Sequence, residues 1–129
     1  MLKFKSAVLF AAALALAPQL AHAQEGDAAA GEKVFKKCQA CHSATEEKNK
    51  VGPHLVGVVG RQAASVEGYK YGDALSAKAA EIGAWDEAKI AEYLADPKAY
   101  IGGTSKMAFK LKDEADRKNV AAYLASLAK

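Results

Sequence analysis

Apolar residues recur at helical spacing in three stretches of the chain, and this pattern predicts three main helices. The first helix is expected to follow Asp27, the second to follow Asp86 and the third to start at Asp113, because aspartate is a favoured N-cap residue. Pro97 should end the second helix, since proline cannot continue the helical hydrogen-bond ladder. The expected apolar faces are Ala28, Gly31, Val34, Phe35 and Cys38 in the first helix, Ile90, Tyr93 and Leu94 in the second, and Val120, Tyr123, Leu124 and Leu127 in the third.

The segments between these helices lack a sustained period. Residues 43–61 are expected to form a loop, whose apolar run 55–59 builds an irregular wall of the core, with a short strand as the alternative. Residues 68–80 should begin with two tyrosines and continue as a short Ala-rich helix, and residues 98–112 should form a second loop. The expected fold class is therefore all-α, with three main helices and one or two short ones.

The N-terminus has the three parts of a secretory signal peptide. Lys3 and Lys5 precede an apolar run over residues 7–17, and Ala-His-Ala at positions 21–23 provides a small-residue cleavage site. Cleavage there would leave a single domain of residues 24–129. An uncleaved membrane anchor is the alternative, although the 11-residue run is well below the about 20 residues that a spanning helix needs.

Composition limits what this domain can do. Loss of Lys3 and Lys5 leaves 16 basic and 15 acidic side chains, a net charge of +1. With no basic stripe interleaved with aromatic residues, nucleic-acid binding is not expected. A domain of this size often needs an additional stabilising element besides its apolar core, and a buried cofactor would provide one.

Cys38 and Cys41, followed directly by His42, form the C-x-x-C-H haem-attachment motif. Each thiol can add to one vinyl group of a haem, because one turn of backbone brings the two sulfurs near the separation of the two vinyls. The adjacent histidine can then offer its imidazole to the iron. A disulfide and a thioredoxin-like redox pair remain alternatives, but the latter needs strands alternating with helices.

Met107 is the candidate for a second axial ligand. It lies in a glycine-rich segment over residues 102–109, which suits a loop closing over a haem face better than a core position. A thioether ligand favours ferrous iron and raises the reduction potential relative to a second histidine. The alternatives are that Met107 fills a gap in the core, and that His54 takes the ligand position.

These features resemble a class I cytochrome c, closest to the soluble bacterial cytochrome c2 type. The resemblance covers nearly all of residues 24–129, and the order of its blocks is more specific than the haem motif alone. The blocks are residues 31–35, 38–42, 52–61, 69–71 with Trp85, 92–94, 96–101, 106–109 and 120–124.

The resemblance implies the class I cytochrome c fold wrapped around one covalent haem c. In it, Cys38 and Cys41 would hold the haem, His42 and Met107 would ligate the iron, and the carbonyl of Pro53 would accept the free imidazole N–H. Residues implied near the haem propionates are Arg61, Tyr71 and Trp85. Tyr93 is implied near the Met107 sulfur. From the pattern alone, Trp85 and Tyr93 can equally be core aromatics, and Arg61 a surface charge.

Two positions depart from the family pattern. Thr104, Ser105 and Lys106 precede Met107 where the family usually has one residue fewer, so either Thr104 or Ser105 can take the hydroxyl role near the propionate. Leu75 stands where mitochondrial relatives often have a polar residue, so the resemblance does not determine the hydrogen-bond network on the Met107 side of the haem.

The implied function is one-electron transfer, Fe(III)/Fe(II), by a periplasmic carrier that is not an enzyme. Two axial ligands leave no open iron position for a substrate. Expected partners are redox proteins with acidic docking surfaces, such as a quinol–cytochrome c reductase, an oxidase, a reaction centre or a periplasmic reductase. The protein itself is expected to be a monomer without stable membrane insertion. The implied docking lysines are Lys36, Lys37, Lys50, Lys98, Lys106, Lys110 and Lys112. The alternative is a haem enzyme or gas sensor whose site opens by loss of Met107.

Overall fold

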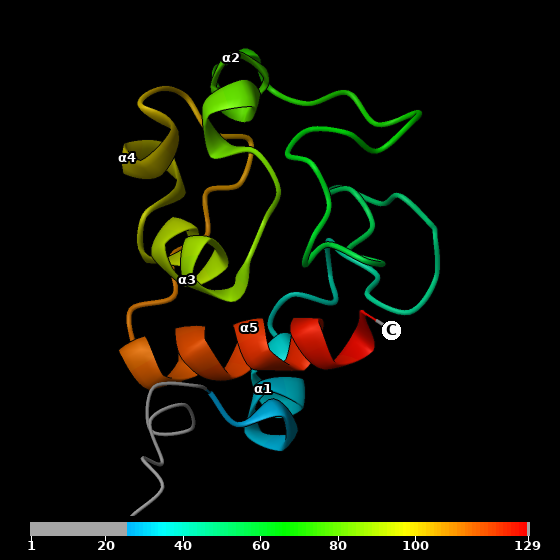
Figure 1. Cartoon of the computed structure of the whole chain (residues 1–129), viewed down its shortest axis with the longest axis vertical. Helices are drawn as coiled ribbons and strands as arrows, with labels where there is room; N and C mark the ends of the chain where they lie inside the picture. Colours follow the sequence, from blue (N-terminus) through cyan, green and yellow to red (C-terminus); the bar gives the residue numbers. More distant parts are fainter. Residues whose placement is uncertain (1–25, 129) are drawn as a thin grey trace, which may run out of the picture.

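The structure is a computed structural model that describes residues 26–128. The expected signal peptide, residues 1–23, lies outside the described residues. The described chain contains five helices: α1 Ala28–Phe35, α2 Asp73–Ile82, α3 Glu87–Ala95, α4 Pro97–Ile101 and α5 Glu114–Leu127 (Figure 1). Between residues 26 and 128 the only β pairing is an isolated bridge between Gln62 and Ala84, so the apolar run 55–59 forms loop rather than strand. The all-α prediction is confirmed.

The three expected N-caps are confirmed. The Asp27 carboxylate accepts the backbone N–H of Ala29 at 2.9 Å, and the carboxylate of Asp86 accepts that of Lys89 at 2.8 Å. Asp113 caps α5 in the same way. Each cap satisfies a helix N–H that has no partner inside the helix, which is why the three helices begin where the sequence predicts.

The prediction that residues 98–112 are all loop is wrong, because α4 occupies Pro97–Ile101. Pro97 ends α3 as expected, but it also opens the next helix. Proline is well tolerated in a first helical turn, where its missing N–H would be unpaired anyway, and the Asp96 carboxylate caps the turn by accepting the N–H of Ala99 at 3.1 Å. The Ala-rich helix also differs from the prediction, since α2 starts only at Asp73 and extends to Ile82.

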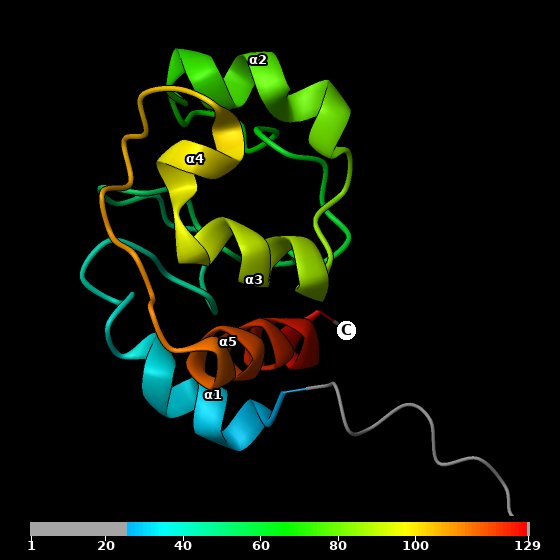
Figure 2. The same cartoon turned by 90° about the vertical axis from the view of Figure 1, so that its left-hand side faces the viewer.

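Close packing of α1 on α5 depends on glycine. A Cβ atom added at Gly31 would lie 1.8 Å from the Asn119 carbonyl oxygen of α5, so only glycine permits this approach. The Phe35 and Tyr123 rings meet beside this contact with centroids 5.5 Å apart. Both views show α1 lying directly under α5 (Figures 1 and 2).

The remaining helices are arranged in tiers above α5. Figure 2 shows α2 at the top, then α4 and α3, with α5 and α1 at the base. The buried core joins these tiers, and its members include Phe35, Trp85, Ile90, Leu94, Val120 and Leu124. All six of these side chains also line one cavity, so the core of this small domain is built around a space rather than filled solid.

Candidate haem site

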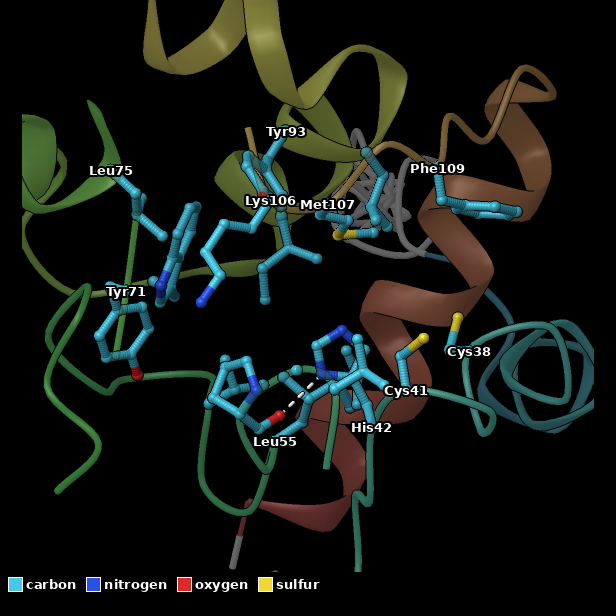
Figure 3. Close-up of a pocket in the computed structure, with 18 of the residues that line it drawn as sticks. Cys38, Cys41, His42, Leu55, Tyr71, Leu75, Tyr93, Lys106, Met107 and Phe109 are labelled. Carbon is cyan, nitrogen blue, oxygen red and sulfur yellow. Dashed lines mark hydrogen bonds between the residues drawn. The ribbon is translucent and has the colours of Figure 1, made fainter. Parts of the chain in front are cut away.

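The cavity has a volume of about 420 Å³ and is walled mainly by apolar side chains. This volume is in the range of ligand and cofactor sites, about 300–1,000 Å³. Its walls come from the end of α1, the loop after it, the segment before α2, α3, the loop carrying Met107, and α5. The sequence elements that carry the candidate chemistry therefore converge on one space (Figure 3).

The two cysteines lie on one wall of this cavity as a single turn of backbone. Cys38 N–H donates to the Phe35 carbonyl at 2.8 Å, and the N–H groups of Cys41 and His42 both donate to the Cys38 carbonyl, at 3.1 and 2.9 Å. Both thiols are free, and burial is the main cause that raises the pKa of Cys38. The wound backbone places both sulfurs at the cavity wall beside His42 (Figure 3).

His42 is held in one orientation. Its Nδ1 lies 2.7 Å from the Pro53 carbonyl oxygen, where a protonated Nδ1 donates and leaves Nε2 as the nitrogen available to a metal. Gly52 packs against the ring, since a Cβ there would lie 2.3 Å from His42 Cε1. Burial lowers the pKa of His42, and the hydrogen bond to Pro53 opposes that shift. The imidazole is thus favoured in its neutral, metal-binding form.

Met107 faces His42 across the cavity. Figure 3 shows the Met107 thioether above the open space and the imidazole below it, with the two cysteines to one side. Met107 is half-buried, packs against the core and lines the cavity. A planar ligand between the two side chains would meet a thioether on one face and an imidazole on the other.

Arg61 and Tyr71 provide unpaired donor capacity in the same cavity. Arg61 Nη1 donates to the carbonyls of His54 and Val56 at 3.0 and 3.1 Å, while its buried Nε has no partner. Burial lowers the pKa of Arg61. The Tyr71 hydroxyl oxygen accepts the Val66 N–H at 3.1 Å, so its own proton is free for an acceptor. Arg61 itself is half-buried, but its Nε is a buried donor without a partner, and such a donor needs an anionic or polar acceptor nearby.

Trp85 and Tyr93 belong to an aromatic cluster on the far wall. Their ring centroids are 5.4 Å apart, and Tyr100 joins both, at 6.0 Å from Trp85 and 5.7 Å from Tyr93. Burial raises the pKa of Tyr93, opposed by a hydrogen bond with the Ser105 side chain. These aromatics thus serve as core residues and also line the cavity, except for Tyr100, which packs behind the other two.

His54 is not placed to compete with Met107. Its Nδ1 accepts the N–H of Val56 at 3.2 Å, its backbone N–H donates to Asn49 Oδ1 at 3.0 Å, and its side chain is not part of the cavity lining. Of the two hydroxyl candidates in the Met107 loop, Ser105 is half-buried and Thr104 is exposed.

Sequence reasoning gave no role to two positions that shape the site. Gly52 lies in the expected loop 43–61, and its lack of a side chain makes room for His42. Ala64 lines the cavity and adopts the left-handed backbone region at φ 56°. Alanine rarely adopts this conformation, so its presence in a sequence does not predict it.

These observations fit a haem with two propionates. Two thiols on one wall match two vinyl groups, and opposed thioether and imidazole groups match two axial positions. The unpaired Arg61 Nε and the free Tyr71 proton suit carboxylates at a third edge. Apolar walls suit the porphyrin faces.

Comparison with known proteins agrees with this geometry. The model of the family "Cytochrome c" matches residues 28–128. Cytochrome c2 of Rhodopseudomonas palustris is 47% identical over 115 residues, covering 78% of this chain and 98% of that protein. Cytochrome c2 of Rhodospirillum rubrum is 44% identical over 130 residues, covering 95% of this chain and 91% of that protein. The solved cytochrome c2 of Rhodospirillum centenum superposes with a TM-score of 0.76 at 41% identity, covering 81% of this chain and all of that one.

The chain therefore belongs to the cytochrome c family, as a class I c-type cytochrome. It is of the c2 type, carries a covalent haem c, and is a haem-based electron carrier. Between residues 26 and 128 the structure contains no helix with the length and apolar character that a membrane crossing requires.

Proposed function

We propose that this protein shuttles single electrons between redox partners in the periplasm, using one haem attached through Cys38 and Cys41 and ligated by His42 and Met107. The observation that carries the proposal is the opposition of His42 and Met107 across a cavity that also holds both thiols. When bound, the haem supplies a reversible Fe(III)/Fe(II) couple. The residues of the chain attach it, hold its ligands and exclude water.

The fixed environment of the cavity suits electron transfer. The Pro53 carbonyl orients His42 and increases the electron donation of the imidazole. A thioether on the opposite face raises the potential. If His42 and Met107 both ligated the iron, no position would remain for a substrate, which supports a carrier rather than an enzyme.

The visible spectrum of the purified holoprotein tests this ligation. A weak far-red band in the ferric spectrum at neutral pH is expected from a methionine sulfur on the iron, and Met107→Ala should abolish it. A low-spin ferric spectrum without the band would reject Met107 as the ligand. A high-spin spectrum would favour the enzyme or sensor alternative.

The mouth of the cavity supports a docking face for an acidic partner. Val51 and Phe109 line the cavity from opposite loops, yet they are 74% and 38% exposed, and Lys37 and Lys106 stand beside them. Lys110 is a weaker candidate because Asp96 lies 3.2 Å from its Nζ and compensates its charge. An apolar centre with a basic rim suits brief, salt-sensitive association.

Lys37→Glu tests the docking face, with Lys118→Glu as the control. Both variants change the charge equally, but Lys118 lies on α5 in a different hollow, paired with Glu114. Lys37→Glu should slow reduction by an acidic redox partner at low salt and flatten its salt dependence, while Lys118→Glu should not. Equal behaviour of the two variants would reject the face.

The proposed periplasmic location rests on the N-terminal pattern. Cell fractionation and the mass of the mature protein test it together. A periplasmic product starting at Gln24, heavier than its residues by one haem, is expected. A membrane-bound product that keeps residues 1–23 would support the anchor alternative.

A further inference from the structure

The residue two positions before Met107 makes an unusual pair of contacts. The Ser105 hydroxyl donates to the Met107 carbonyl at 2.8 Å, and its oxygen accepts the Met107 N–H at 3.2 Å. A single short side chain thereby satisfies both backbone polar groups of the residue whose side chain faces His42. Residues 105–107 are in neither a helix nor a strand, so the Ser105 contacts take the place of the backbone hydrogen bonds that regular secondary structure would provide.

The neighbouring side chains show that Ser105 is directed inward. Ser105 is half-buried and lies near enough to Tyr93, which reaches the loop from α3, to lower the pKa of the Tyr93 phenol against the effect of burial. Thr104, the preceding residue, is exposed, and no side-chain hydrogen bond involves it within the described chain. Two adjacent hydroxyl residues therefore differ sharply in environment, although the sequence alone leaves them equivalent.

A second tether holds the outside of the loop in place. Lys106 Nζ donates to the Lys70 carbonyl at 2.6 Å and lies 5.0 Å from the centroid of the Tyr69 ring. The Tyr69 hydroxyl in turn donates to the Val51 carbonyl at 2.9 Å. Because Lys106 ties the loop to the segment before α2, loss of the Ser105 contacts should free Met107 locally without detaching the loop.

We propose that Ser105 is a positioning residue for Met107, whose hydroxyl fixes the Met107 main chain so that the thioether faces His42. The two hydrogen bonds of this hydroxyl with the Met107 main chain thereby keep the sulfur in place. The inference rests on the proposed function, because it matters to the iron only if Met107 is the ligand.

Competition with added imidazole measures how firmly Met107 is held. Imidazole can reach ferric iron only after the thioether leaves, so its apparent affinity depends on the population of the open loop. Removing both Ser105 contacts should raise that population about ten-fold, which corresponds to about 1.4 kcal/mol. The apparent imidazole Kd should fall by the same factor.

The experiment uses ferric holoprotein at one neutral pH and one ionic strength, with loss of the far-red band as the readout. Ser105→Ala should bind imidazole about ten-fold more tightly than the wild type. Ser105→Thr, which keeps the hydroxyl, should restore most of the wild-type value. Thr104→Ala is the matched control and should change the Kd less than about two-fold, about 0.4 kcal/mol.

Two results would overturn the inference: an unchanged Kd in Ser105→Ala, or equal shifts in Ser105→Ala and Thr104→Ala, since equal shifts mean general loosening of the loop. A wild-type protein without the far-red band would instead reject Met107 ligation itself, so the two failures are distinguishable.

If Ser105→Ala does not accumulate with haem, amide hydrogen exchange in the wild-type protein tests the Ser105 contact with the Met107 N–H instead. The Met107 N–H should exchange at least about ten-fold more slowly than that of Ala108, which has no acceptor within residues 26–128. Equal exchange rates, corrected for the intrinsic rates of the two residues, would contradict the hydrogen bond from the Met107 N–H to Ser105.

Discussion

Replacing Gly52 by alanine should damage the haem site through a single methyl group. The added Cβ would lie 2.3 Å from His42 Cε1, 2.8 Å from Nδ1 and 2.9 Å from Nε2. Carbon atoms in contact are optimally about 3.5–4.0 Å apart, so the ring or the loop must move by about 1.2 Å or more. The imidazole has little freedom to do so, because its Nδ1 is held 2.7 Å from the Pro53 carbonyl oxygen.

The expected loss follows from these two contacts. Overpacking of a filled site costs about 1–3 kcal/mol, and weakening of the Pro53 hydrogen bond adds about 0.5–1.5 kcal/mol. Gly52→Ala should therefore lower the unfolding free energy of the holoprotein by about 1.5–4.5 kcal/mol. It should also shift the reduction potential, since the bond that increases imidazole donation is strained.

Denaturant unfolding of the ferric holoprotein, followed by far-ultraviolet circular dichroism, measures the effect. Gly72→Ala is the control, because its Cβ would meet only the flexible Lys106 stem at 3.3 Å, and its cost should stay below about 1 kcal/mol. If Gly52→Ala unfolds within about 1 kcal/mol of the wild type at an unchanged potential, the tight packing of Gly52 on His42 is refuted.

Three further predictions follow from single residues. Arg61→Gln should lower the reduction potential by about 40–90 mV, because removing a half-buried cation near the haem favours ferric iron by about 1–2 kcal/mol. Arg61→Lys should restore most of the lost potential, and equal potentials in all three proteins would contradict this reasoning. Ala64→Gly should stabilise the protein by up to about 1 kcal/mol in thermal unfolding, since Ala64 holds φ 56°, and a destabilised variant would show that its methyl group contributes more through packing. The pKa of Asp96 is lowered, first by the Ala99 N–H and then by Lys110, so its contribution to stability is present above the unfolded-state pKa and is lost as pH falls through the folded-state value. Asp96→Asn should therefore reduce the acid dependence of unfolding, and an unchanged stability–pH curve would exclude that contribution.

The prediction for residues 98–112 failed for a specific physical reason. A proline in a helical pattern predicts the end of the helix, and here Pro97 does end α3. The same residue is also suited to a first turn, and Asp96 before it is suited to an N-cap. Local sequence permits both outcomes, and α4 forms because Pro97 and Ile101 find buried surroundings in the folded chain. Burial of this kind depends on the neighbours that the fold brings, which no local pattern contains.

Local chemistry in the sequence determined the main helices and the class of protein. Aspartate caps and helical periodicity act within a few residues, so Asp27, Asp86 and Asp113 mark helix starts without reference to the rest of the chain. The spacing of Cys38, Cys41 and His42 is equally local, since one turn of backbone carries all three groups.

Tertiary structure alone decided how distant segments meet at the cavity. It turned Ser105 rather than Thr104 inward, placed His54 outside the lining, left Arg61 Nε unpaired and set Gly52 against His42. Each of these outcomes depends on distances between segments that are far apart in the chain or on which side of a loop faces the core. Such distances follow from the packing of the whole domain, whereas caps and motifs follow from the backbone geometry of a single turn.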